Sequence, residues 1–232
     1  MPPKKNAAQE TKSSGESVSK MTLRERKPST QAPINNKPKK VSAKKRKAKE
    51  EIKAVTPKKR EVDTEVDNDL SSKSETIYEF KAKTNSGEEV PLSKYEGHVC
   101  IIVNVASKCG YTKSNYEQLV ELYNKYSKDK GLRILAFPCN QFGSQEPGDS
   151  EKICDFAKKR KVTFDLFEKI TVNGKTAHPL WKFLKLQKDG PKGEDIDWNF
   201  TKFLINKKGE VVERYKSSVQ PKTLVKELEK LW

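Results

Sequence analysis

The first 73 residues of this 232-residue chain contain no Phe, Tyr, Trp, Cys or His. All of these residue types are confined to the part of the chain between Glu75 and Trp232. The first segment carries instead 20 Lys and Arg against 10 Asp and Glu. A segment with no aromatic residues and a strong net charge cannot bury enough apolar surface to offset the entropy lost on ordering. We therefore expect residues 1–73 to be a disordered basic tail and residues 74–232 to form one domain.

The sequence also lacks long apolar runs. The longest, Val99 to Val103, is far shorter than the roughly 20 residues that cross a bilayer. No apolar stretch follows Met1, so we expect no secretory signal and a nuclear or cytoplasmic location. In a reducing compartment, the four cysteines are expected to be thiols rather than a disulfide framework. Neither they nor His98 and His178 have the close spacing of a structural zinc site.

Two basic clusters in the tail resemble a bipartite nuclear localisation signal. They are Lys44–Lys47 and Lys58–Arg60, separated by ten residues. This pattern predicts an import receptor as a partner. The alternative is a solvated basic linker that binds polyanions, including nucleic acid, weakly.

Strand and helix patterns alternate after Glu75. Val99–Val105 and Leu132–Phe137 are apolar runs typical of strands buried on both faces, and side chains at helical spacing lie between them. A strand, a helix and a strand in succession predict a βαβ unit with parallel strands. Further elements are expected as a hairpin of Ile77–Lys81 and Glu88–Leu92, helices near Ser150–Lys159 and His178–Lys185, a hairpin of Phe203–Ile205 and Val211–Tyr215, and a terminal helix from Pro221. Together they predict an α/β domain of the thioredoxin-like fold, with a central mixed sheet flanked by helices.

Cys109 follows the first predicted strand and precedes a helix. At that position the positive end of the helix dipole and the charge of Lys108 favour a thiolate, which is the nucleophilic form of cysteine. The alternative is a small core residue, and the loop position beside Gly110 argues against it. Cys109 is therefore the candidate nucleophile.

Three sequence blocks resemble the signature motifs of the glutathione peroxidase family. They are Asn104–Thr112, Phe137–Gly148 and Trp198–Leu204, in the order and spacing of that family. The resemblance covers essentially all of residues 75–232 and is strongest with the cysteine-containing, phospholipid-hydroperoxide branch. It implies a thioredoxin-like fold and a thiol peroxidase that reduces hydrogen peroxide and organic or lipid hydroperoxides, with no metal or flavin cofactor.

The resemblance also assigns roles to individual residues. Cys109 matches the peroxidatic position, and Gln145, Trp198 and Asn199 match the residues that surround it. Indole and amide N–H groups aimed at the sulfur would stabilise its anion and polarise the peroxide during attack. The implied reaction oxidises Cys109 to a sulfenic acid, which thiols then reduce.

The resemblance leaves the reducing co-substrate open between thioredoxin and glutathione. Cys154 matches the resolving cysteine of thioredoxin-dependent members, with an ordinary core-facing helix cysteine as the alternative. In selenium-containing phospholipid-type members, lysines that help to hold glutathione stand where this chain has Tyr111 and Asp197. The resemblance therefore favours thioredoxin here. Cys100 and Cys139 are better explained as buried structural thiols.

Tetrameric members of the family have a longer segment where this chain has Gln187–Asp197. We therefore expect a monomer with an open site that admits membrane-embedded hydroperoxides through transient contact. A second hypothesis, from a different class, is a nuclear peroxide-sensing or nucleic-acid-binding protein that relays oxidation to a partner.

Overall fold

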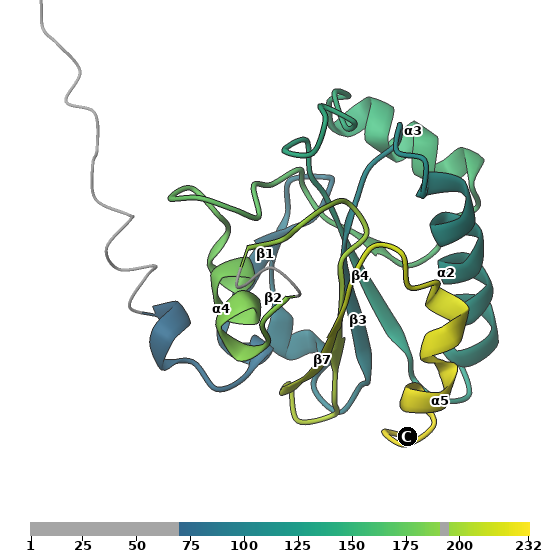
Figure 1. The fold of residues 1–232 in the computed structure, drawn as a ribbon. Coiled ribbons are helices and arrows are strands. Elements are labelled where there is room, and N and C mark those ends of the chain that lie inside the picture. The colour runs from purple at the N-terminus through teal and green to yellow at the C-terminus, as the bar shows by residue number, and fades with distance from the viewer. Residues whose placement is uncertain (1–69, 191–194) are drawn as a thin grey trace, which may run out of the picture. The chain divides into compact units, whose positions relative to one another are not determined.

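The structure is a computed structural model that describes residues 70–190 and 195–232. The expected basic tail and its two clusters lie outside the described residues, except for positions 70–73. The described chain folds around a five-stranded sheet with helices on both faces (Figure 1). A separate two-stranded hairpin precedes this sheet in the sequence.

The central sheet has the strand order β5-β4-β3-β6-β7. β3 (Cys100–Val105) and β4 (Arg133–Pro138) are parallel, as the βαβ pattern predicted, and β5 (Asp165–Leu166) is parallel to β4. β6 (Lys202–Ile205) is antiparallel to β3, and β7 (Val211–Tyr215) is antiparallel to β6. The sheet is therefore mixed, as expected. β5 is too short for a hydrophobic period to reveal it in the sequence.

Helices cover both faces of this sheet. α2 (Thr112–Tyr126) connects β3 to β4, α3 (Ser150–Lys159) follows β4, and α4 (Pro179–Gln187) precedes β6. The expected terminal helix is two short pieces, a 3-10 turn at Pro221–Leu224 and α5 (Val225–Leu228). Figure 1 shows α2 and α5 on one side of the sheet and α4 on the other. Within the described residues, no helix has both the length and the apolar character to span a bilayer.

The N-terminal hairpin differs from the prediction in its first strand. β1 (Lys81–Lys83) and β2 (Glu89–Pro91) pair antiparallel, whereas Ile77–Glu79 forms a 3-10 turn. The cause is local, because the Glu79 carboxylate accepts the N–H of Thr76 at 3.1 Å. Side-chain bonds of this kind compete with strand pairing and favour a turn.

β3 is buried along its whole length and supplies both cores of the domain. Cys100 and Ile102 point into the core that also contains residues of α4, and Ile101, Val103 and Val105 point into the core beneath α2 and α5. This alternation is what the continuous apolar run predicted. The carboxyl ends of β3 and β4 then lead into loops at the same edge of the sheet, where α/β folds place their functional sites.

Candidate active site

Cys109 lies in the loop between β3 and α2. Its side chain is buried, with 8% of its surface exposed. Thr112, the first residue of α2, accepts the N–H of Cys109 on Oγ1 at 3.1 Å and donates that hydroxyl to the carbonyl of Ala106 at 2.7 Å. The loop is thus held on both sides of the thiol, at a helix N-terminus, where negative charge is stabilised.

Gln145 and Asn199 come from separate loops and bond to each other. Asn199 Nδ2 donates to Gln145 Oε1 at 3.0 Å and lies 3.5 Å from the carbonyl oxygen of Phe142. Gln145 is joined in turn to the loop of Cys109, because its carbonyl accepts the N–H of Lys108 at 3.0 Å. The structure therefore brings these loops together. Among the described residues, however, no hydrogen bond joins Cys109 Sγ to any of the predicted partners.

Trp198 stands at the surface of this site, with 38% of its area exposed and its ring centroid 5.9 Å from that of Phe142. Its carbonyl accepts a hydrogen bond from Asn104 Nδ2 at 3.1 Å. Asn104 Oδ1 accepts the N–H of Thr201 at 2.9 Å. A buried amide of β3 therefore ties the Trp198 loop to the strand that leads to Cys109. This role of Asn104 was not predicted, although a lone amide inside an apolar strand was a signal for one.

Two residues of the site loops have a left-handed backbone. Ser144, with φ 52°, precedes Gln145, and Phe200, with φ 64°, follows Asn199. For a residue other than glycine this conformation costs about 1–3 kcal/mol and persists only where surrounding contacts enforce it. Both amide-bearing residues are therefore positioned by loops that the fold holds firmly.

One such contact at Phe200 comes from Lys202. This lysine is fully buried in β6, and its Nζ donates to the carbonyls of Phe200 and Val219, both at 2.8 Å. Burial lowers the pKa of the Lys202 ammonium to about 7, since both of its partners are neutral carbonyls. Nothing in the sequence pattern marked Lys202 as buried, because a lysine in a short strand looks like an exposed residue.

Glu146, directly after Gln145, is a buried carboxyl beside the Cys109 loop. Only 1% of its surface is exposed, and its Oε2 finds no hydrogen-bond partner among the described residues. Burial raises the pKa of this carboxyl, while hydrogen bonds from Ser107 and the charges of Lys169 and Lys108 oppose the rise. It borders a cavity of about 320 Å³ together with Ser107, Lys108, Pro147, Gly148, Lys152 and Phe156. Nothing in the sequence pattern marked this carboxyl as buried.

Cys154 lies on the face of α3 that points away from the Cys109 loop. Lys152 and Phe156 of α3 line the cavity beside Lys108, whereas Cys154 lines a separate depression with the turn at residues 84–86. Positions 152 and 154 are about 200° apart around a helix. Cys154 is a half-buried free thiol outside both cores, so it is not the core-facing residue of the alternative interpretation. From this face, we expect that a disulfide with Cys109 would need α3 to rearrange, because the two Cα atoms must come within about 7 Å of each other.

The other two cysteines are fully buried free thiols, as expected. Cys100 Sγ lies 3.6 Å from the carbonyl oxygen of His98, and Cys139 Sγ lies 3.6 Å from Gln141 Oε1. Burial raises the pKa of both thiols, that of Cys100 to about 12. In residues 70–190 and 195–232, no cluster of three or more His, Cys, Asp or Glu side chains is arranged to hold a metal ion.

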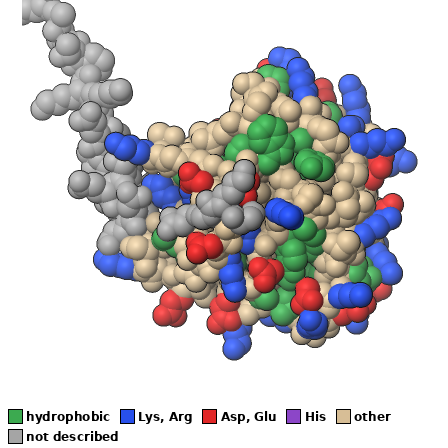
Figure 2. Space-filling view, in the orientation of Figure 1, with side chains coloured by type: hydrophobic (Ala, Val, Ile, Leu, Met, Phe, Trp, Pro, Cys, Tyr) green, Lys and Arg blue, Asp and Glu red, His purple; other side chains and the backbone are tan. Residues whose placement is uncertain are grey.

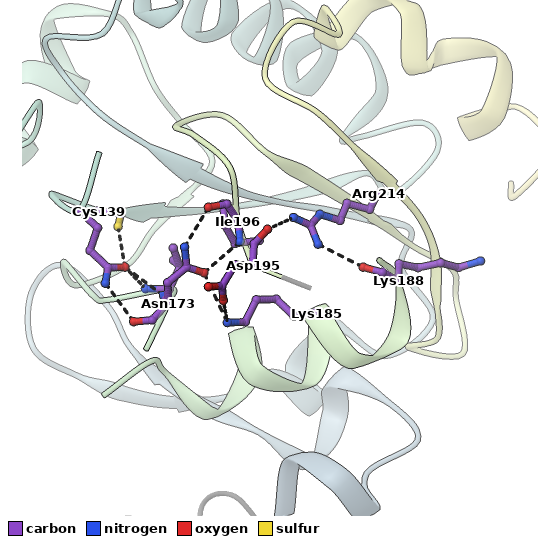
Figure 3. A network of polar contacts seen from close by, with 9 residues as sticks. Cys139, Asn173, Lys185, Lys188, Asp195, Ile196 and Arg214 are labelled. Atoms are coloured by element: carbon purple, nitrogen blue, oxygen red, sulfur yellow. Dashed lines mark hydrogen bonds and ion pairs between the residues drawn. The ribbon is translucent and has the colours of Figure 1, made fainter. Parts of the chain in front are cut away.

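A polar network fixes the segment that leads into the third sequence block (Figure 3). Asn173 and Ile196 exchange two hydrogen bonds, from Asn173 Nδ2 to the carbonyl at 2.8 Å and from the Ile196 N–H to Oδ1 at 2.9 Å. Lys185 of α4 pairs with the Asp195 carboxylate at 3.0 Å, and Arg214 Nη2 donates to the Asp195 carbonyl at 2.6 Å. Elements far apart in the sequence therefore set where this loop begins.

Apolar surface remains exposed on the loops of the site. Tyr111 and Trp198 are two of the few large hydrophobic side chains with more than a third of their area exposed. Figure 2 shows hydrophobic side chains gathered near the top of the face in view, with Lys and Arg side chains around them. Such a surface suits contact with an apolar substrate or partner.

Comparison with known proteins identifies relatives. A family model described as glutathione peroxidase matches residues 77–185. The probable glutathione peroxidase 5 of Arabidopsis thaliana is 54% identical over 156 residues, which are 67% of this chain and 90% of that protein. A probable phospholipid hydroperoxide glutathione peroxidase of Nicotiana sylvestris is 53% identical over 162 residues, which are 69% of this chain and 95% of that protein.

Solved structures show the same architecture. The crystal structure of T. cruzi GPX1 matches with a TM-score of 0.57 and 42% identity, over 67% of this chain and 95% of that one. A thiol:disulfide interchange protein of the thioredoxin family from Chlorobium tepidum matches with a TM-score of 0.51 and 15% identity, over 66% of this chain and 92% of that one. The second likeness concerns the fold alone, and it confirms the expected thioredoxin-like class.

Proposed function

This chain belongs to the glutathione peroxidase family, and from that membership we propose that Cys109 is its peroxidatic nucleophile. The protein is a thiol peroxidase that reduces hydroperoxides. The observation that supports Cys109 is the junction of loops around it. The Lys108–Gln145 backbone bond joins the loop of Gln145 to the loop of Cys109, and the Asn199–Gln145 side-chain bond joins Asn199 to Gln145.

In the proposed reaction the Cys109 thiolate attacks one oxygen of ROOH, the O–O bond breaks, and the other oxygen leaves with a proton as ROH. Cys109 becomes a sulfenic acid. Because Asn199 occupies Gln145 Oε1, the Gln145 amide keeps its N–H donors for the sulfur or the peroxide. The Trp198 indole supplies another donor for the charge that develops. Since sulfur carries both electrons, the cycle needs no metal or flavin.

The reductant is a thiol, and we propose a dithiol protein of the thioredoxin class rather than glutathione. Tyr111 and Asp197 stand where glutathione-dependent members carry lysines, so the glutathione carboxylates lack those positive charges here. Cys154 serves as the resolving cysteine. Its thiol displaces the hydroxyl of the Cys109 sulfenic acid, an S–S bond forms, and water leaves.

The nucleophile is tested by following the consumption of hydrogen peroxide and of a phospholipid hydroperoxide with thioredoxin, thioredoxin reductase and NADPH. Cys109→Ser should abolish turnover and leave the fold intact, because no other group supplies the electrons. Cys100→Ala removes a buried thiol that has no proposed role, and should retain turnover. Wild-type turnover by Cys109→Ser would refute the mechanism.

The resolving step is tested by treating the protein with one equivalent of peroxide. Mass spectrometry of non-reduced peptides should find a Cys109–Cys154 disulfide that thioredoxin reduces. Cys154→Ser should consume the first equivalent but lose thioredoxin-driven cycling, with sulfenic acid accumulating at Cys109. Normal cycling of that variant would favour a one-cysteine mechanism with glutathione.

We further propose that the enzyme acts as a monomer and contacts membranes only transiently, through the exposed aromatic side chains of Tyr111 and Trp198. Its hydrodynamic mass should be that of one chain. It should reduce hydroperoxides in phospholipid vesicles without co-sedimenting with them. A stable dimer, or tight vesicle binding, would contradict this proposal.

The basic clusters Lys44–Lys47 and Lys58–Arg60 support a proposal about location, made from the sequence alone. We propose that an import receptor reads them together and that the peroxidase is nuclear as well as cytoplasmic. Changing either cluster to Ala should move a fluorescent fusion from the nucleus to the cytoplasm, and exclusively cytoplasmic wild-type protein would refute the idea. The alternative function of a nuclear sensor or nucleic-acid-binding protein gains no support from the relatives, which are named as peroxidases.

A further inference from the structure

The first turn of α3 is held from outside by the turn between β1 and β2. Asn85 Nδ2 donates to the carbonyl of Ser150, the first residue of α3, at 2.9 Å. The two residues are 65 positions apart in the sequence. Asn85 Oδ1 is buried and has no hydrogen-bond partner within the described part of the chain, so the bond to Ser150 is what positions this amide.

The carbonyl that Asn85 contacts is directly linked to Cys154. In an α-helix the carbonyl of residue i accepts the N–H of residue i+4, so the partner of the Ser150 carbonyl within α3 is the N–H of Cys154. The side chain of Cys154 lines the depression between α3 and the turn that carries Asn85. Asn85 therefore holds the same carbonyl, that of Ser150, from which the N–H of Cys154 must separate if the chain around Cys154 unwinds.

The turn itself is firmly anchored. The N–H of Asn85 donates to the carbonyl of Leu166 in β5 at 2.9 Å, and the N–H of Gly87 closes the turn on the Thr84 carbonyl at 2.8 Å. Asn85 therefore joins α3 to the edge of the central sheet. Loss of its side-chain amide would free the start of α3 while leaving the backbone of the turn in place.

We propose that Asn85 is a positioning residue of the resolving step, which holds α3 folded and limits the rate at which Cys154 reaches the oxidised Cys109. This inference rests on the role of Cys154 proposed above. The hydroperoxide oxidises Cys109 to the sulfenic acid while α3 stays folded. The start of α3 then unwinds, and the sulfur of Cys154 bonds to that of Cys109. The S–O bond breaks, and the hydroxyl leaves as water with the Cys154 proton.

The two steps separate in stopped-flow measurements on the full chain, because oxidation of Cys109 depends on peroxide concentration and disulfide formation does not. Asn85→Ala should leave the first rate constant unchanged and raise the second by roughly two- to tenfold, the range expected from loss of one neutral hydrogen bond. Asn85→Asp keeps the shape of the side chain but cannot donate, so it should behave like Asn85→Ala. Ser86→Ala, in the same turn, should change neither step.

Hydrogen exchange provides a readout that does not depend on the chemistry. In a Cys154→Ser background, Asn85→Ala should speed amide exchange in residues 151–155, and Ser86→Ala should not. If the rate constant of disulfide formation is unchanged or lower in both Asn85 variants, the role of Asn85 is refuted and the resolving role of Cys154 still stands. If the wild type forms no Cys109–Cys154 disulfide at all, the resolving role of Cys154 fails, and with it the function assigned to Asn85.

Discussion

Asn199 Nδ2 donates to Gln145 Oε1 at 3.0 Å, so two amides that are 54 positions apart in the sequence are joined directly to each other. The bond orients the Gln145 amide, because its oxygen is occupied and its nitrogen stays available as a donor. It also satisfies the nitrogen of the fully buried Asn199 side chain, whereas Asn199 Oδ1 has no hydrogen-bond partner among the described residues. In the mechanism proposed above, Asn199 therefore acts on the sulfur through Gln145.

This coupling can be measured with a double-mutant cycle. Gln145→Ala and Asn199→Ala should each slow the oxidation of Cys109 by peroxide by about 100-fold, the lower end of the range for removal of a donor to a developing charge. The double variant should be little slower than Gln145→Ala alone, because Asn199 acts through Gln145. Rapid-mixing kinetics at several peroxide concentrations give the rate constants. Fully multiplicative effects would show that the two amides act independently.

Trp198 allows its indole N–H to be tested apart from its bulk. Trp198→Phe keeps an aromatic ring against Phe142 but removes the only donor of the side chain. It should slow peroxide attack several-fold and leave the denaturation midpoint close to that of the wild type. Trp198→Ala should slow the reaction further. Equal rates for the wild type and Trp198→Phe would mean that Trp198 contributes packing alone.

Glu146 makes stability depend on pH. Burial raises the pKa of the Glu146 carboxyl in the folded protein. The contribution of Glu146 to the free energy of unfolding is therefore fully present below the unfolded pKa of about 4.3, and it is lost as pH rises through the folded pKa. Glu146→Gln should therefore be more stable than the wild type at pH 7, and the difference should vanish toward pH 4.

Urea denaturation of both proteins across this pH range measures the effect of Glu146. The exposed Glu88 provides the control, since Glu88→Gln should leave stability unchanged at every pH. A destabilised Glu146→Gln at pH 7 would show that Ser107 and the nearby lysines compensate fully for burial of the carboxylate.

Lys202 should give a pH dependence in the alkaline range. Burial lowers the pKa of its ammonium to about 7 in the folded protein, against about 10.4 in the unfolded chain. Between these two pKa values the unfolded state binds more protons than the folded state, so the free energy of unfolding should rise with pH across this window. The contribution of Lys202 to stability is lost as pH falls through 7. Relative to Lys202→Met, the wild type should gain roughly 2–4 kcal/mol between pH 7 and pH 10.

Denaturation at pH 7, 8.5 and 10 checks this prediction, with Lys208→Met as an exposed control. A constant difference between the wild type and Lys202→Met would mean that the ammonium stays charged in the folded state. Lys202→Met should also slow the oxidation of Cys109 by peroxide, because the carbonyl of Phe200, next to Asn199, loses the hydrogen bond from Lys202.

Much of the fold follows from local patterns. The apolar run that became β3, the helix between it and β4, and the C-terminal hairpin each have a length and a period that identify them. The differences occur where a side chain acts on its own neighbourhood. Glu79 converts the start of the first predicted strand into a turn, and β5 forms because β4 offers an edge rather than because its two residues favour a strand.

By itself, the sequence determined which chemistry is present. A cysteine between a strand and a helix, and three blocks that resemble one family, were enough to predict a thiol peroxidase and the residues to examine. Only the tertiary structure decided how those residues meet. Asn104 reaches Trp198 across 94 positions, Lys202 and Glu146 are buried although their types favour the surface, and Cys154 faces away from Cys109. The physical reason is that periodicity reports contacts within one element, whereas burial, loop closure and the direction of a helix face depend on packing between elements far apart in the chain.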